Sequence, residues 1–169
     1  MTKYVKSKPL NIPCVSAPRA KGIVSKVVIT LTNNDLDLDK EETIANELSN
    51  FCSYHYIIDS KGKVGSLVPE WDRAFSSGNA NIDHSAIGIL IKRAYVADDA
   101  EELEERNQSL IELLRYIKTR RKIEDFQYDD SKKQNLYIVS RNNKVRSMLS
   151  KTSPVYGELK TLINYNLYD

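Results

Sequence analysis

Long apolar runs are missing from this chain of 169 residues. No segment approaches the roughly 20 apolar residues that span a bilayer as a helix. The N-terminal stretch MTKYVKSKPLNIP also lacks the apolar core of a secretory signal. We therefore expect neither a membrane-spanning segment nor secretion through a signal of the chain's own.

Residues that bind metals or act as bases are scarce. The chain has two histidines, His55 and His84, and two cysteines, Cys14 and Cys52. It has no Cys-x-x-Cys pair and no glycine-rich phosphate loop opening a helix. A serine nucleophile would need a base within reach, and no sequence pattern identifies an acidic residue that would orient either histidine. We expect His55 to be a hydrogen-bonded strand residue and His84 a surface loop residue. The sequence leaves open whether the cysteines pair.

Charge of one sign does not dominate the chain. It has 25 basic and 23 acidic residues, a net charge of +2, which does not favour nucleic acid as a partner. Acidic residues gather at 35–47 and 98–105, and basic ones at 118–122 and 132–151. We interpret these groups as solvated surface, since charge runs on helices usually face water. The basic loop from 141 to 151 could also meet an acidic partner.

What the chain does contain is an alternation of strand and helix patterns. β-Branched and apolar runs predict strands, and apolar residues at helical spacing predict helices. This interleaving predicts a single α/β domain with a central mixed β-sheet flanked by helices. The predicted strands are 26–32, 54–59, 64–68, 86–91 and 136–139, and the predicted helices are 40–52, 101–122 and 155–167.

The first residues have a different composition from the rest. Residues 1–22 carry Pro9, Pro13 and Pro18 and show no helical period. Proline-rich segments without periodicity are typical of extended chain. We therefore divide the sequence into an extended arm, 1–22, and a domain, 23–169.

Several segments, in order, resemble the zinc-dependent N-acetylmuramoyl-L-alanine amidases, a family that includes phage lysozyme-amidases and peptidoglycan recognition proteins. SYHYIID before a glycine turn is similar to the family's tyrosine-histidine-aromatic strand. LVPEWDRAF resembles the segment before its Ala-Trp-His-Ala-Gly loop, and HSAIGILI resembles its Ser-Ile-Gly-Ile strand. The resemblance extends over roughly residues 24–165 and implies the amidase fold.

The resemblance also locates the three positions at which the family holds zinc. The histidine that ends the first strand aligns with Thr30, and the histidine after the late short strand aligns with Ser140. The aspartate or cysteine before the proline-glycine pair aligns with Ser153. Catalytic zinc sites use imidazole, thiolate or carboxylate ligands, and neutral hydroxyls are far weaker donors. We therefore expect no metal, no cofactor and no catalytic residue, and we expect that His, His and Cys at these positions would rebuild a zinc site.

Two accessory residues of the family persist. Tyr54 aligns with the tyrosine beside the metal in phage lysozyme-amidases, and Lys151 with the basic residue that there helps to stabilise the oxyanion. Ser76 replaces the family's loop histidine. These three residues are candidates for a binding cleft, although packing of Tyr54 and solvation of Lys151 explain them equally well.

The resemblance and the missing ligands together suggest a catalytically inactive amidase-fold protein, encoded by a phage, that acts by binding or as a virion or tail component. Its location would be the virion or the host cytoplasm. The alternatives are a regulatory binder of a protein such as RNA polymerase, a non-catalytic peptidoglycan binder, and an active amidase. The sequence does not identify the partner, the oligomeric state or the source.

Overall fold

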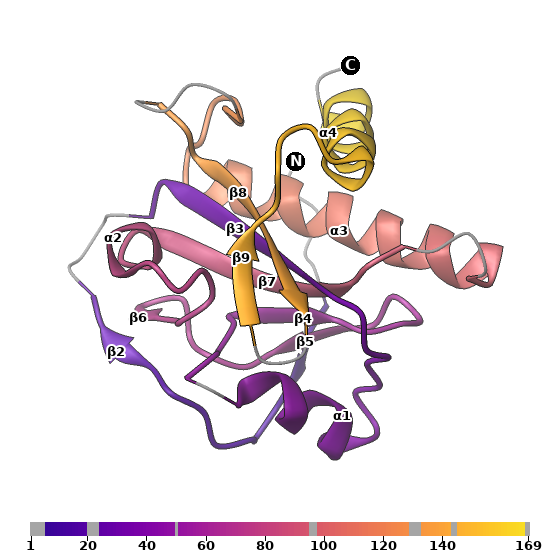
Figure 1. The fold of residues 1–169 in the computed structure, drawn as a ribbon. Coiled ribbons are helices and arrows are strands. Elements are labelled where there is room, and N and C mark those ends of the chain that lie inside the picture. Colours follow the sequence, from indigo (N-terminus) through magenta and orange to yellow (C-terminus); the bar gives the residue numbers. More distant parts are fainter. Residues whose placement is uncertain are drawn as a thin grey trace.

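A seven-stranded mixed sheet forms the centre of the molecule, in the strand order β1-β5-β4-β7-β3-β8-β9 (Figure 1). The structure is a computed structural model, and it describes residues 6–19, 24–49, 51–94, 98–128, 133–142 and 145–167. In that spatial order the strands are Lys8–Pro9, Val64–Ser66, Tyr56–Ile58, Ala86–Lys92, Lys26–Thr32, Leu136–Asn142 and Val145–Met148.

Four adjacent strands, β4, β7, β3 and β8, run parallel to one another. β5 is antiparallel to β4, and β9 is antiparallel to β8, so two hairpins flank the parallel centre. Parallel strands buried on both faces are built from continuous β-branched and apolar runs, which KVVITLT and AIGILI are. The predicted mixed sheet flanked by helices is confirmed.

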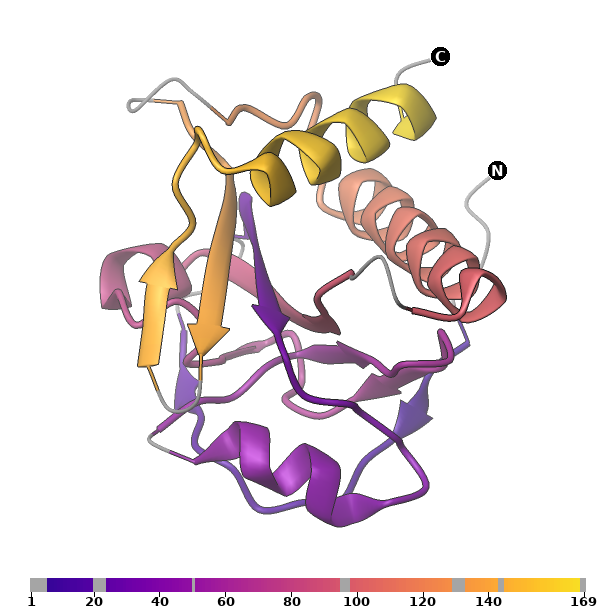
Figure 2. The same ribbon diagram turned by 45° about the vertical axis from the view of Figure 1, so that its right-hand side comes forward.

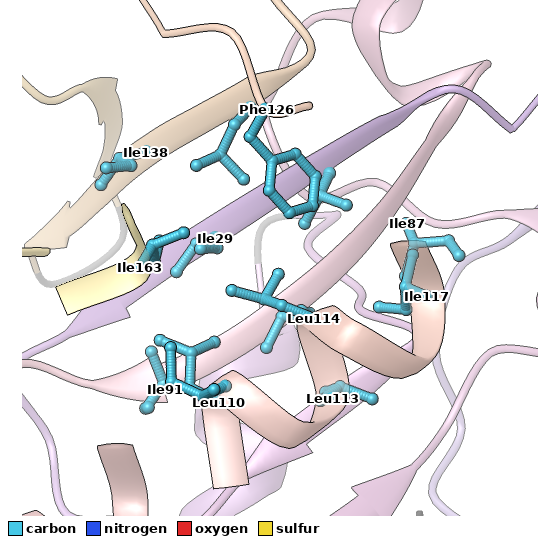
Figure 3. Close-up of a cluster of buried hydrophobic side chains, with 14 of the residues drawn as sticks. Ile29, Ile87, Ile91, Leu110, Leu113, Leu114, Ile117, Phe126, Ile138 and Ile163 are labelled. Carbon is cyan, nitrogen blue, oxygen red and sulfur yellow. The ribbon is translucent and has the colours of Figure 1, made fainter. Parts of the chain in front are cut away.

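Two helices cover one face of the sheet. They are α3, Ala100–Arg120, and α4, Pro154–Leu167 (Figures 1 and 2). Alternate residues of β3 and β7 point to this face and pack against the apolar stripe of α3, as Figure 3 shows for Ile29, Ile87 and Leu114. Burial of apolar surface contributes about 25 cal/mol per Å². This cluster contains more buried apolar residues than the others, so it is the main source of stability.

The opposite face is covered by shorter elements and loops. These include α1, Glu41–Ala45, continued by a 3₁₀ turn at Asn46–Leu48, and α2, Ala80–Asp83. A smaller apolar cluster around Ile44, Tyr54 and Leu90 lies here. Several buried polar residues lie on this side as well, so it is the face that carries the candidate site.

Part of the predicted arm is attached to the domain. β1 extends the sheet beside β5, and β2, Ala17–Pro18, pairs with β6, Asp72–Arg73. Arg19 donates hydrogen bonds to the carbonyl oxygens of Glu70 (2.9 Å) and Ala86 (2.8 Å). Residues 1–5 and 20–22 of the arm lie outside the described residues. No helix of the described part of the chain is long and apolar enough to cross a bilayer.

One expectation about a loop was wrong. The stretch 141–151 is expected from the sequence to be a basic loop, but Val145–Met148 forms the edge strand β9. The polar segment 71–82 contains β6 and the start of α2. Asn79 begins α2 because its side chain accepts hydrogen bonds from the backbone N–H groups of Asn81 and Ile82.

Candidate functional site

Thr30 lies on β3 with its side chain on the face opposite α3 and α4. Val28 and Thr32 share that face, because side chains alternate along a strand. Thr30 is fully buried, and its hydroxyl donates a long hydrogen bond to the carbonyl oxygen of Ser76 (3.4 Å). The hydroxyl is therefore already engaged with the backbone of the loop above it.

Ser140 does not share this face. In the parallel ladder Thr30 lies opposite Val139, whereas Ser140 lies opposite Leu31. Directly opposed residues point to the same side of a sheet, so Ser140 is on the side of α3 and α4. The next pair is a check on this register: Thr32 opposes Arg141, and both bind Glu47 on the Thr30 side. The structure therefore places Thr30 and Ser140 on opposite faces.

Ser153 lies at the start of α4. β9 runs back along β8, with Met148 opposite Val139, and the N–H of Leu149 donates to the carbonyl of Ile138 (2.9 Å). The chain thus reaches Ser153 at the end of the sheet where β8 begins, and Figure 2 shows α4 starting there. Its carbonyl accepts a hydrogen bond from the N–H of Gly157 (3.2 Å). No hydrogen bond joins any two of Thr30, Ser140 and Ser153.

This arrangement does not fit a catalytic zinc ion. Zinc needs imidazole, thiolate or carboxylate ligands that converge on one point. Thr30 offers only a neutral hydroxyl. Neither Val139, which lies opposite it, nor the adjacent Ser140 has an imidazole, thiolate or carboxylate group. Among the residues that the structure describes, no three His, Cys, Asp or Glu side chains lie close enough together to hold a metal.

The predicted cleft residues are mostly covered. Tyr54 is fully buried and Ser76 is 1% exposed, whereas Lys151 is exposed. Ser76 lies directly on the sheet, since a Cβ placed on Gly88 would be 2.5 Å from its Oγ. In this conformation neither Tyr54 nor Ser76 can touch a ligand, so these three residues do not line one open cleft. Burial raises the pKa of the Tyr54 phenol.

Arg146 of β9 helps to hold the covering loop in place. Its guanidinium donates to the carbonyl of Phe75 (2.6 Å) and lies 3.7 Å from the Cβ position of Gly78. Asp83 accepts hydrogen bonds from the hydroxyl of Ser76 (3.3 Å) and the N–H of Ser77 (3.0 Å). Burial raises the pKa of Asp83 despite these bonds. The loop is thus fixed over Thr30 from both sides.

A buried ion pair stabilises the same face beyond Thr30. The Nε of Arg141 lies 3.1 Å from Oε2 of Glu47, and both side chains are almost fully buried. Thr32 donates to the other carboxylate oxygen (2.7 Å), and Asn34 does so as well (2.8 Å). The interpretation of residues 35–47 and 132–151 as solvated charge was wrong for Glu47 and Arg141. Alternation along β8 from the buried Val139 is the signal that indicates the inward position of Arg141.

His55 is hydrogen-bonded, as expected from the sequence. Its Nδ1 accepts from the N–H of Gly88 (2.9 Å), which leaves the proton on Nε2 to be donated to the carbonyl of Asp72 (2.8 Å). The ring is 1% exposed, and burial lowers its pKa to about 4. His55 is therefore a neutral structural residue. His84 follows α2 and is half-buried.

The two cysteines do not form a disulfide. Cys14 is half-buried in the arm and Cys52 is buried. Burial raises the pKa of the Cys14 thiol, which makes it a poorer nucleophile.

Solved structures of other proteins share the fold of this chain. No curated protein matches the chain. Among solved structures, the endolysin N-acetylmuramoyl-L-alanine amidase LysCS from Clostridium intestinale is similar, with 19% identity, a TM-score of 0.58, and coverage of 97% of this chain and 99% of that one. The hydrolase AmiA from Staphylococcus aureus (10%, 0.60, covering 80% and 66%) and PGRP-Hd from Alvinella pompejana (12%, 0.52, covering 78% and 85%) share the fold.

The family model N-acetylmuramoyl-L-alanine amidase (Amidase_2) matches residues 19–154, which is most of the chain. That span begins at the arginine that attaches the arm and contains every strand of the central sheet except β1. Sequence and architecture agree, and the chain belongs to the N-acetylmuramoyl-L-alanine amidase family.

Proposed function

We propose that this chain is a non-hydrolytic member of the amidase family that acts by binding, as a virion or tail component encoded by a phage. One observation carries the proposal. The position where β3 would present the first zinc ligand holds a buried threonine, Thr30, whose neighbour on the same face is Val139. No ligand-type side chain stands at either position.

Hydrolysis of an amide at neutral pH needs an activated water. A catalytic zinc ion supplies it by lowering the pKa of bound water to about 7. The hydroxyls of Thr30 and Ser76 have no comparable activating group. Both ring nitrogens of His55 are already hydrogen-bonded, to Gly88 and Asp72. Ser76 donates to Asp83, but it is 1% exposed, so its hydroxyl is not accessible to a substrate. These contacts support a role without bond cleavage.

The burial of Tyr54 and Ser76 also favours binding through the outer surface over binding in the family's cleft. A peptidoglycan binder would need accessible groups there, and of the three candidates only Lys151 is exposed. Similarity to the endolysin LysCS is what suggests a phage origin. Regulation of a polymerase and peptidoglycan binding remain the alternatives that experiments must separate.

The proposal is tested by incubating the purified protein, with added zinc, with purified cell walls and measuring released amino groups. LysCS serves as the active control. We expect no release above the buffer blank, whereas release that a chelator abolishes would contradict the proposal.

A pull-down on insoluble peptidoglycan separates the binding roles. We expect the protein to stay in the supernatant. Retention that is lost in Lys151→Glu but kept in Lys61→Glu, an exposed lysine on a different turn, would assign wall binding to the cleft instead. Mass spectrometry of virions, or a copurified polymerase, then distinguishes scaffold from regulator.

A further inference from the structure

The two edges of the sheet differ in how well they are protected. β1 forms one edge with two residues, and Pro9 has no N–H to offer a further strand. β9 forms the other edge, Val145–Met148, and contains neither proline nor glycine. Figure 2 shows β9 at the outside of the sheet, beside β8. An unprotected edge is a template for pairing with another chain.

The backbone register shows which groups of β9 are open. The hydrogen bond from Leu149 N–H to the Ile138 carbonyl makes that pair a hydrogen-bonded one. Pairs alternate along an antiparallel ladder, so Val145 and Ser147 also bond to β8. The N–H and C=O groups of Arg146 and Met148 therefore point away from the sheet. They form a ready set of two donors and two acceptors for one more strand.

The side chains around this edge are apolar and basic. Val145 is 67% exposed and Met148 is 47% exposed, and both are among the few large apolar residues that face water. A charge that could guard the edge is turned inward, because Arg146 binds the Phe75 carbonyl across the face. Residues 131–157 contain no Asp or Glu. In the described part of this stretch the exposed basic residues are Lys133, which precedes β8, and Lys151, which follows β9.

We infer that β9 is a docking edge for an extended, acidic segment of another protein, which adds antiparallel to it as an eighth strand. Main-chain hydrogen bonds to Arg146 and Met148 would supply affinity, and alternate side chains would supply specificity. Acidic residues on the partner match the exposed lysines Lys133 and Lys151, while its apolar residues cover Val145 and Met148. This inference names the partner class for the binding role proposed above and rests on it.

The probe is a capped peptide, Glu-Val-Leu-Thr-Glu-Val-Asp, titrated into the ¹⁵N-labelled full chain at low salt. Two peptide controls are the same sequence with lysine at each acidic position, and the original methylated on the leucine nitrogen. We expect shifts centred on the amides of Arg146 and Met148, and binding at least about fivefold weaker for the methylated peptide, because it lacks one hydrogen bond. Absence of binding up to the solubility limit, or equal binding of the lysine peptide, overturns the inference.

Variants of the protein make the same test from the other side. Met148→Pro removes an outward N–H without removing a bond to β8, so it is expected to abolish binding, while Met148→Leu retains it. Lys151→Glu should weaken binding about threefold, and Lys61→Glu, with the same change in net charge, should not. If sedimentation instead shows a dimer that Met148→Pro dissociates, the occupant is a second copy and the acidic partner is excluded. Wall hydrolysis is read in a separate assay, so failure of the proposed function is distinguishable from failure of this inference.

Discussion

Thr30 of β3 and Val139 of β8 lie opposite each other in the parallel ladder, on the face of the sheet turned away from α3 and α4. Both are fully buried. At the point where the amidase family resemblance places a zinc ligand, the two central strands thus present a hydroxyl and an isopropyl group.

Restoring ligand-type residues at the aligned positions is expected to fail. The sequence suggested that Thr30→His, Ser140→His and Ser153→Cys together would rebuild a zinc site. Because Ser140 faces the helices and Ser153 begins α4, we now expect the folded triple variant to bind no stoichiometric zinc. Metal analysis after dialysis checks this. One equivalent of zinc in a folded triple variant would show that the three positions converge.

Gly88 is expected to resist any side chain. A Cβ there would lie 2.5 Å from Oγ and 2.6 Å from Cβ of Ser76, so the loop must move. Gly88→Ala should lower the free energy of unfolding by about 1–3 kcal/mol. Gly157→Ala is the matched control: nothing lies within 4 Å of that site in α4, and it should raise stability by about 0.5–1 kcal/mol. Denaturant titration measures both, and a Gly88→Ala protein as stable as wild type would contradict the closed loop.

The ion pair between Glu47 and Arg141 should be costly to break from one side. Both side chains are buried, so Arg141→Ala leaves a carboxylate without its charge partner. We expect a loss of about 3–5 kcal/mol in the free energy of unfolding. Lys61→Ala, at an exposed position, should change it by less than about 0.5 kcal/mol. Equal effects of the two substitutions would show that Arg141 is solvated.

His55 should make stability depend on pH. Its pKa is about 4 in the folded protein against about 6.5 for a solvated histidine in the unfolded chain, so below pH 6.5 the unfolded chain takes up a proton that the folded one does not. Stability is therefore lost as pH falls from about 6.5 to about 4, by about 3 kcal/mol from this residue. In His55→Asn, whose side-chain oxygen can accept from Gly88, the slope over that interval should be shallower. An unchanged slope would mean that His55 is not buried neutral.

Much of the architecture could be predicted because it rests on local patterns. KVVITLT was expected as a strand and is one from Lys26 to Thr32, and the apolar stripe of α3 predicted its position to within two residues at each end. β9 could not be predicted, because VRSM has no apolar alternation and forms a strand only by pairing with β8. Tertiary context decides such strands.

The candidate site was predictable in residue type but not in geometry. Alignment identified Thr30 and Ser140 as hydroxyls, but only the register between β3 and β8 shows that they face opposite ways. A shift of one residue moves a side chain to the other face of a sheet, and sequence similarity does not fix that register. The burial of Glu47 was missed for a related reason, since its partner Arg141 is distant in sequence.

Zinc titration of the wild-type protein by calorimetry, coupled to metal analysis of the dialysed sample, tests the account most directly. The closed face at Thr30 and Val139 predicts no saturable binding and no retained zinc. One tightly held zinc per chain, lost together with cell-wall cleavage on addition of a chelator, would contradict it.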